Sequence, residues 1–278
     1  MKSFLQKIFS IKNIDNKKVI TLLGVKIKHQ TFRQFVKQQL VELSYVLEKD
    51  IQTAYIHQKV FPKYKNINAG KTVVLCGAGP SLNKYEPIKD AVHVALNRAC
   101  NFNKVKFDYL FAQDWKGIYN IIEDIISYEG NNCIKFIGTQ NDFEKEEIPE
   151  SEIAKFQCER YVTDLHRWSF CNEHHFTKDL STQPLGNFGT IAFPAMQFVL
   201  WTNPEKIYLA GCDSAPVGHF SGEILEANKR ALNDNTYSKI INQWKELKKF
   251  ADFHYPGTEI ISINPVGLKG IFKDIYTE

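Results

Sequence analysis

Several sequence patterns that are typical of particular classes of protein are missing from this sequence of 278 residues. No apolar run approaches the ~18 to 20 residues of a membrane-spanning helix, and the N-terminus lacks the continuous apolar core of a signal peptide. The six cysteines are scattered without a CxxC pair, which disfavours both a disulfide framework and a zinc site. We therefore expect a cytoplasmic chain with reduced thiols and no bound metal.

Two signatures of phosphate binding are absent as well. Leu82 stands where a GxGxxG fingerprint has its third glycine, and the loop before it has no Lys-Ser/Thr pair like that of a P-loop. The chain also contains no DxD motif, the sign of a metal-dependent nucleotide-sugar transferase. If this chain binds a nucleotide, backbone N–H groups and side chains must hold the phosphate.

Composition and charge describe an ordinary globular chain with a basic start. With 44% hydrophobic and 24% charged residues, it can bury the core of one large α/β domain. Residues 1–60 carry eleven Lys/Arg against four Asp/Glu, a balance of +7, whereas the rest carries 24 against 27, a balance of −3. The basic start favours an anionic membrane surface as its partner. Nucleic acid is not expected, because no basic stripe with interleaved aromatics crosses the body.

The first 66 residues are expected to form an appendage to the main domain. Residues 1–12 mix lysines with large apolar residues, an amphipathic pattern suited to a lipid interface or to packing on the domain. Residues 18–28 break at Gly24 and predict a hairpin. Residues 31–61 carry apolar side chains at helical spacing and predict a long helix, with Thr31 as its cap.

Residues 67–278 alternate short apolar runs with helical stretches, which predicts the α/β class: a Rossmann-like, doubly wound and mostly parallel sheet. The carboxyl ends of parallel strands share one edge, so the polar residues after them should surround one crevice. A helix at residues 236–253 is expected to cover the sheet. The predicted strands are Thr72–Cys76, His93–Leu96, Tyr109–Ala112, Cys133–Ile137, Lys206–Ala210 and Glu259–Ile263.

Two glycine loops predict the nucleotide site. In KTVVLCGAGPSLN, residues 71–83, an apolar strand runs into glycines that let a ligand approach the backbone, and Ser81 can cap the next turn and donate its hydroxyl. In GNFGT, residues 186–190, a second loop enters an apolar helix whose N-terminus suits an anion. The predicted nucleotide- and donor-binding residues are Gly77, Ala78, Gly79, Pro80, Ser81, Asn97, Gln113, Asp114, Asn187, Gly189 and Thr190.

Two further stretches carry residues suited to chemistry. In KIYLAGCDSAPVGHFSG, residues 206–222, a strand delivers Asp213, which could orient a hydroxyl, tune a histidine or bind Mg²⁺. His219 follows in a glycine-bracketed loop and is the candidate general base. Residues 160–176 crowd aromatics and histidines, typical either of a lid that stacks on a sugar or base or of a packed excursion between strands. The predicted acceptor-lid residues are His166, Arg167, Trp168 and His174.

Five motifs are scattered from Lys71 to the C-terminus: CGAGPSL, the strand ending at Asn97, GNFGT, YLAGCD and SINPVGLKGIF. They resemble those of the bacterial sialyltransferases of glycosyltransferase family 42. They equally resemble the related domains of motility-associated factors and of 6-hydroxymethylpterin pyrophosphokinase-like proteins. The opening KIFSIKN, with KVITLLGVKIK, is similar to the N-termini of bacterial surface-glycan glycosyltransferases.

The resemblance implies a nucleotide fold that uses a CMP-activated acidic sugar without an obligatory metal. This chain departs from the family at two places. The family has asparagine where this chain has Ala78, and it has tyrosines where this chain has Ser214, Ala215 and Pro216. The family's catalytic histidine would fall near Thr236 and Tyr237, so we expect His219 to act in its place. The resemblance assigns Gly77, Gly79, Pro80 and Ser81 to the phosphate loop, Asn97 to the CMP moiety, Gly189 and Thr190 to nucleotide or donor groups, and Asp213 to the donor.

We predict a glycosyltransferase of bacterial cell-surface glycan synthesis, in lipooligosaccharide or capsule. It would transfer a sugar from a CMP-activated acidic donor to a hydroxyl of an oligosaccharide or glycolipid, without a required cofactor. It would work in the cytoplasm, with its basic N-terminus on the inner membrane. One alternative is a pyrophosphokinase-like enzyme that uses ATP and Mg²⁺, with Asp114 and Asp213 as metal ligands. Another is a non-catalytic nucleotide-binding partner in a glycan-assembly complex.

Overall fold

The chain divides into two units, Met1–Gln52 and Thr53–Glu278, and each is described by itself. A computed structural model gives the fold and describes residues 9–14, 17–22, 25–30, 32–113, 122–129, 132–139, 150–155, 157–164, 176–222 and 234–277. The division falls inside a long helix, α2 (Phe32–Val60), whose last residue lies in the core of the second unit. The functional boundary at residue 66 stays a prediction.

The first unit holds a three-stranded antiparallel sheet, β1 (Phe9–Ile14), β2 (Lys17–Leu22) and β3 (Val25–Gln30). Strands β2 and β3 pair antiparallel with Leu22 opposite Val25, which confirms the predicted hairpin. The predicted break at Gly24 lies outside the described residues. The amphipathic leader is only partly described: its residues 9–12 belong to β1, where alternate residues face opposite sides of the sheet.

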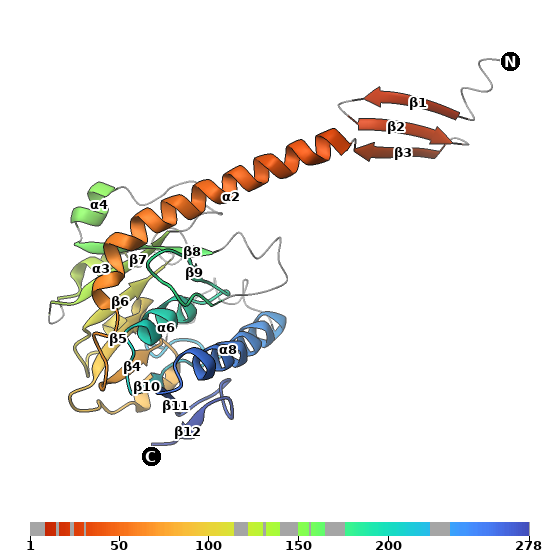
Figure 1. Ribbon diagram of the computed structural model, residues 1–278. Helices are drawn as coiled ribbons and strands as arrows, with labels where there is room; N and C mark the ends of the chain where they lie inside the picture. Colours follow the sequence, from red (N-terminus) through yellow and green to blue (C-terminus); the bar gives the residue numbers. More distant parts are fainter. Residues whose placement is uncertain are drawn as a thin grey trace. The chain divides into compact units, whose positions relative to one another are not determined.

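The second unit is built on a sheet of nine strands, and every pairing within it is parallel (Figure 1). The central strands are short apolar runs because a parallel sheet is covered on both faces. This confirms the predicted α/β fold. The strands are β4 (Thr72–Cys76), β5 (Val92–Leu96), β6 (Tyr109–Ala112), β7 (Ile134–Thr139), β8 (Cys158–Asp164), β9 (Leu185–Gly186), β10 (Lys206–Ala210), β11 (Glu259–Ile263) and β12 (Lys273–Ile275).

The order of the strands creates one switch point in the sheet. The order is β12-β11-β10-β4-β5-β6-β7-β8-β9, so the chain builds outward from β4 to β9 and then returns to the other side of β4. Connections from β4 and β10 therefore leave in opposite directions. In open parallel sheets, ligands bind outside the carboxyl ends of such a strand pair. The fold alone points to the loops after β4 and β10.

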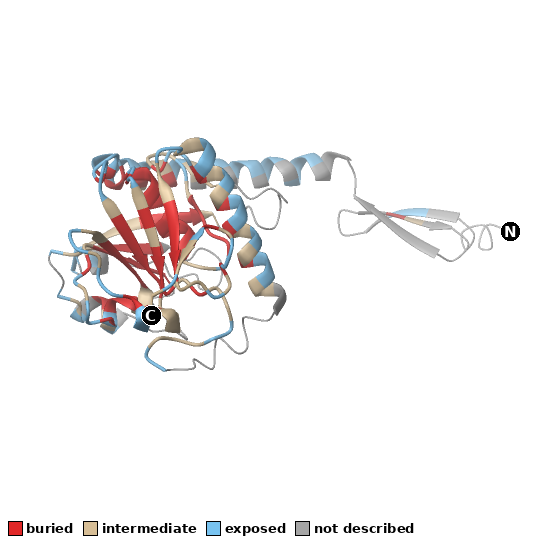
Figure 2. Cartoon of the chain, turned by 90° about the horizontal axis from the view of Figure 1, so that it is seen from below, coloured by how far each residue is buried: buried red, intermediate tan, exposed pale blue. Residues whose placement is uncertain are grey.

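Two long helices cover one face of the sheet, α6 (Ala192–Trp201) and α8 (Asp234–His254), as Figure 1 shows. Every residue of α6 is buried, in keeping with its apolar sequence, and its only proline, Pro194, lies in the first turn where a missing N–H costs little. From α8, Ile240, Trp244 and Leu247 enter the same core at helical spacing. Figure 2 shows this core as buried strands between more exposed surroundings.

The opposite face carries shorter elements. Its core joins alternate residues of the central strands, such as Val74 and Leu110, to residues of the turns that follow them, such as Leu82 and Cys100. These elements hold the loops at the carboxyl ends of β4 and β5 in place. The short helices that contribute to this core are η2 (Pro80–Lys84), η3 (Asn97–Asn101) and α3 (Ile122–Ser127). Of the other two, η1 (Pro62–Tyr64) packs Tyr64 into the core of the first face, and α4 (Glu150–Lys155) precedes β8.

All six predicted strands are present, and four of them, β4, β6, β10 and β11, have the predicted ends. Strand β5 begins one residue earlier than expected, and β7 is shifted toward Thr139. Strands β1, β8, β9 and β12 were not predicted. Within the described residues, no helix combines the length and the apolar character needed to cross a bilayer.

Candidate active site

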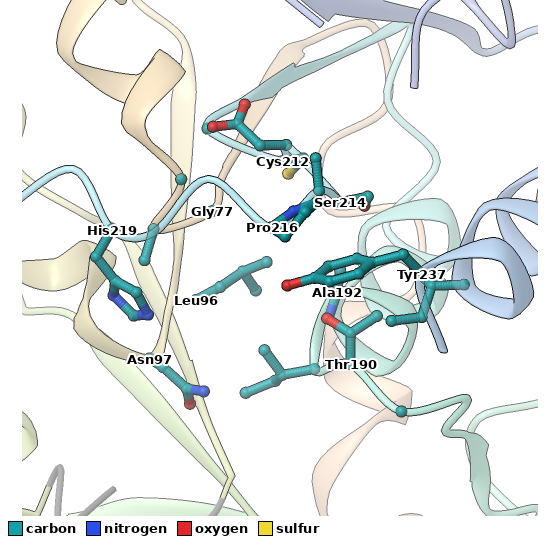
Figure 3. Close-up of a pocket in the computed structure, with 18 of the residues that line it drawn as sticks. Gly77, Leu96, Asn97, Thr190, Ala192, Cys212, Ser214, Pro216, His219 and Tyr237 are labelled. Atoms are coloured by element: carbon teal, nitrogen blue, oxygen red, sulfur yellow. The ribbon is translucent and has the colours of Figure 1, made fainter. Parts of the chain in front are cut away.

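A pocket of about 330 Å³ lies at the switch point between β4 and β10. The loops after β4, β5 and β10, the turn before α6 and the first half of α8 all contribute to its wall (Figure 3). Segments more than a hundred residues apart in sequence therefore meet at one place. The polar or glycine residues at its wall include Gly77, Gly79, Asn97, Gly189, Thr190, Gly211, Asp213, Ser214, Gly218, His219 and Tyr237.

The loops after β4 and β10 touch closely enough to require glycine. Gly77 N–H donates to Ala210 O at 2.8 Å, and Gly79 N–H donates to Gly211 O at 2.8 Å. A Cβ atom on Gly79 would lie 2.7 Å from Gly211 O and 2.3 Å from a carboxylate oxygen of Asp213. These glycines thus allow backbone to pack on backbone, while the other side of the loop faces the pocket.

Asp213 fixes the end of the glycine loop by hydrogen bonds to Ser81. One oxygen of its carboxylate accepts the Ser81 N–H at 3.0 Å, and the other accepts the Ser81 hydroxyl. The residue is buried, and this burial raises the pKa of the Asp213 carboxyl, while both bonds from Ser81 act to lower it. Both donors of Ser81 are therefore engaged by protein, so an anion in the pocket would meet other N–H groups.

Several residues at the pocket wall carry such N–H groups, among them Ala78, Gly189 and Thr190. The backbone N–H groups of Ala78, Gly189 and Thr190 have no hydrogen-bond partner among the described residues. Gly189 has φ +82°, and a Cβ atom there would meet nothing within 4 Å. Thr190 lies two residues before α6, next to the N-cap residue Ile191, and the N-terminal dipole of this helix favours a negative charge. Two loops from different parts of the chain thus offer free donors to the same space.

Asn97 has an unusual backbone and an oriented side chain. It follows β5 with φ +48°, a conformation that asparagine tolerates better than most residues. Its side-chain oxygen accepts the Gln113 N–H at 3.0 Å. Because that bond fixes the oxygen, the amide nitrogen is left as the group that Asn97 can offer to a ligand (Figure 3).

His219 lies on the same side of the pocket as Asn97 (Figure 3). The loop that carries it is attached to the glycine loop through the next residue. Phe220 N–H donates to Ala78 O at 2.9 Å, and Phe220 O accepts the side-chain amide of Asn83 at 2.8 Å. The imidazole is therefore positioned beside the loop that would bind a phosphate.

Tyr237 and Thr190 face His219 from the other side of the pocket. Tyr237 comes from the first turn of α8, and its hydroxyl points into the pocket (Figure 3). The Thr190 hydroxyl lies near it in the same view and accepts the Ala192 N–H at 3.4 Å. The arrangement pairs an imidazole with a phenol across a space bordered by free backbone donors. Such a site can bind a phosphate, stabilise a leaving anion and remove a proton from a hydroxyl.

No protein-family model matches this chain, and no curated protein sequence does. Solved structures of similar fold include the sialyltransferase CST-II in complex with a trisaccharide acceptor and CMP, with 14% identity over 69% of this chain and 80% of that chain, at a TM-score of 0.45. Another is CstII from Campylobacter jejuni in complex with cytidine-5'-monophosphate, with 14% identity over 70% and 80% and a TM-score of 0.44.

The MAf glycosyltransferase from Magnetospirillum magneticum AMB-1 is a third neighbour, with 11% identity and a TM-score of 0.45. The match covers 81% of this chain but only 38% of that protein. These likenesses concern the fold.

The structure brings together eight of the predicted site residues. Four others lie away from the pocket wall: Pro80 and Ser81 follow the glycine loop in η2, Gln113 is buried behind Asn97, and Asn187 is buried with a side-chain oxygen that has no hydrogen-bond partner among the described residues. Asp114, His166, Arg167, Trp168 and His174 lie outside the described residues. The eight at the pocket wall are Gly77, Ala78, Gly79, Asn97, Gly189, Thr190, Asp213 and His219.

Tyr237 is the functional candidate that sequence reasoning missed. The helix at residues 236–253 was expected only to cover the sheet, and most of it does. The available signal was that the resemblance placed a catalytic residue near Thr236 and Tyr237 themselves, in a first turn with little apolar character. The described residues contain no cluster of three or more His, Cys, Asp or Glu side chains suited to a metal ion. Independence from metal stays a prediction.

Proposed function

We propose that this chain is a glycosyltransferase that moves a sugar from a nucleotide donor, a CMP-activated acidic sugar, to a saccharide hydroxyl. The observation that supports it most is the convergence at the switch point of free N–H groups from two loops with His219 and Tyr237. Cleavage of the sugar–phosphate bond places negative charge on the leaving nucleotide. A site that stabilises this charge accelerates the reaction more than one that binds the substrate alone.

The leaving phosphate would sit against the glycine loop and the start of α6. The N–H groups of Ala78, Gly189 and Thr190 would donate to its oxygens, and the amide nitrogen of Asn97 would contact the nucleotide. The pocket volume of about 330 Å³ lies at the lower end of the range for small-molecule sites, about 300–1,000 Å³. It therefore suits a nucleotide, with the acceptor approaching from the open side.

His219 would act as the general base on the acceptor hydroxyl. Its loop is attached to the glycine loop through Phe220, so the base and the phosphate-binding donors keep a fixed relation. Tyr237 would donate its phenolic hydrogen to the developing charge from the opposite side. Asp213 has a positioning role, because its carboxylate holds Ser81.

The wider role follows from the sequence motifs described above and from the charge of the N-terminus. We assign the acceptor to the oligosaccharides or glycolipids of bacterial cell-surface glycans, such as lipooligosaccharide or capsule. The excess of basic residues over residues 1–60 supports a place on the inner, anionic surface of the membrane. No metal ion or other cofactor is required in this proposal.

Binding measurements test the nucleotide, and transfer assays test the base. Calorimetry with CMP should give the same affinity with and without EDTA, whereas Mg²⁺-dependent binding of ATP would favour the pyrophosphokinase-like alternative. His219→Ala should lower turnover by about 10²- to 10⁴-fold while CMP still binds. The control is His254→Ala, since His254 lies outside the pocket. If Asp213→Asn and His219→Ala both leave glycan structure in cells unchanged, a non-catalytic nucleotide-binding role replaces the enzyme.

A further inference from the structure

Helix α2 exposes an apolar stripe within the first unit of the chain. Five large apolar side chains recur at intervals of three and four residues, and all of them are exposed, up to 69% for Ile51. At 100° per residue, they fall within about 80° of the helix circumference. Soluble proteins rarely leave such a continuous apolar surface uncovered. The stripe consists of Val36, Leu40, Leu43, Leu47 and Ile51.

The charges of this helical segment indicate which kind of partner covers the stripe. From Phe32 to Gln52 the sequence has three basic residues, Arg33, Lys37 and Lys49, and three acidic ones, Glu42, Glu48 and Asp50. Helices that bind anionic membranes carry an excess of Lys and Arg beside their apolar face. A neutral helix with a narrow apolar stripe is instead typical of helix–helix pairing.

Two charged residues lie on the same flank of the stripe. Lys37 and Glu48 are both exposed, and eleven residues of helix place them within about 20° of each other around the axis. In an antiparallel pair of helices, residues of the same flank face each other across the interface. A two-fold axis midway between residues 42 and 43 would place Lys37 of each copy opposite Glu48 of the other. In a parallel pair in register, Lys37 would instead lie level with Lys37 of the other helix, and Glu48 level with Glu48, so that opposite charges would not meet.

We propose that α2 pairs with the α2 of a second copy of this chain, antiparallel, through the stripe Val36–Ile51. With the two-fold axis at residues 42 and 43, the apolar residues of one helix fall between those of the other along the axis, as knobs-into-holes packing requires. The two Lys37–Glu48 pairs then flank the apolar seam symmetrically. The interface is isologous, so it closes at a dimer and does not propagate.

The length of the stripe sets the expected strength of the pair. Fifteen residues of helix span about 22 Å, and two helices in contact over that length bury on the order of 1,000 Å² in total. That area lies at the low end of specific interfaces. We therefore expect a reversible dimer that dissociates in the micromolar range, not an obligate one.

Sedimentation velocity of the full chain over a range of micromolar concentrations tests the proposal. The wild type should shift from monomer to dimer, and Leu40→Glu combined with Leu47→Glu should weaken the dimer by about tenfold or more. Val41→Glu is the matched control: Val41 is 62% exposed against 58% for Leu40, but lies about 120° from the middle of the stripe. It should leave the dimer intact.

A charge swap tests the direction of pairing. Lys37→Glu and Glu48→Lys should each weaken the dimer, and the double variant should restore it; failure to restore would rule out the antiparallel register. Circular dichroism should show unchanged folding, because every substituted side chain is exposed. A wild type that stays monomeric throughout, or a stripe variant that dimerises like the Val41→Glu control, overturns the proposal. Flotation with anionic vesicles that depends on Leu40 in a monomeric protein would assign the stripe to lipid instead.

Discussion

The carboxylate of Asp213 accepts both the backbone N–H and the side-chain hydroxyl of Ser81, and so ties the end of β10 to the loop after β4. These two strands are adjacent in the sheet but far apart in the sequence. The conformation of the glycine loop thus depends on a residue that follows the neighbouring strand. An aspartate at the end of a strand can serve a site without touching the substrate.

Replacing Asp213 should weaken nucleotide binding and stability together. Asp213→Asn removes one of two buried acceptors for Ser81, which should lower the free energy of unfolding by about 1–3 kcal/mol. Ser81→Ala keeps the backbone bond and should cost less, about 0.5–1.5 kcal/mol. Urea unfolding and calorimetry with CMP measure both effects. Asp252→Asn, at an exposed residue, is the control, and an Asp213→Asn variant with wild-type affinity and stability would show that the tie is unimportant.

Position 79 must be glycine because the Asp213 carboxylate and the Gly211 carbonyl both lie too close for a Cβ atom. In Gly79→Ala, the new methyl group would meet a carboxylate oxygen of Asp213 and the carbonyl of Gly211, neither of which can move without breaking a bond already made. We expect a loss of about 1–3 kcal/mol in unfolding free energy and weak or absent CMP binding. Gly257→Ala has open space around it and should change neither quantity. Equal behaviour of the two variants would contradict the close packing.

The central sheet could be predicted because its strands are buried on both faces. Strands β4, β6, β10 and β11 are mainly apolar, with the sequences TVVLC, YLFA, KIYLA and EIISI, and each is followed by a glycine or a polar residue that marks the end. Strand β8, with the sequence CERYVTD, has too many polar residues for that pattern, since the first half of it is only half-buried. Strands β9 and β12 have two and three residues, too few to show any period.

The site could be predicted in part for the same reason. Asn97 was found because it directly follows a recognisable strand, and Thr190 because it precedes a recognisable helix. His219 was found because it lies in a glycine-bracketed loop after a strand. The engagement of Ser81 by Asp213 could not be predicted, because it depends on the adjacency of β4 and β10 and on a hydrogen bond over 132 residues of sequence. Tyr237 was not chosen as a site residue because the sequence around it predicts a helix that covers the sheet. Only the packing of α8 shows that the first turn of this helix reaches the pocket.

A buried histidine makes the second unit sensitive to acid. The His57 side chain lies between two elements: Nδ1 is 2.9 Å from Gln183 O, and Nε2 accepts the Val162 N–H at 2.8 Å. Burial lowers the pKa of His57 from 6.5 to about 4, since the charged form loses water and would give up the bond from Val162. The folded state therefore favours the neutral ring, whereas the unfolded state takes up a proton below about pH 6.5.

Stability should accordingly fall as the pH is lowered from 6.5 to 4, by about 3 kcal/mol from this residue. Urea unfolding across this range measures the slope. A His57→Gln variant should be less stable at pH 7 but should lose less stability on acidification, because it carries no titrating group there. The unfolding free energies of the two proteins are compared at each pH, so that the contribution of carboxylates that titrate in the same range cancels in the difference. Parallel pH profiles for wild type and variant would show that His57 does not set the slope.

Tyr237 should contribute to the chemical step through its hydroxyl alone. The hydroxyl points into the pocket opposite His219, where the proposed transfer develops negative charge on the leaving phosphate (Figure 3). A hydrogen bond to a charged group contributes about 1.5–3 kcal/mol, so Tyr237→Phe should lower turnover by about 10- to 150-fold. Because this charge develops on bond cleavage, CMP-sugar affinity should change less than turnover. Tyr276→Phe, at an exposed residue, is the control. Turnover unchanged in Tyr237→Phe, or lost equally in both variants, would remove this phenol from the mechanism and leave the backbone donors as the groups that stabilise the leaving nucleotide.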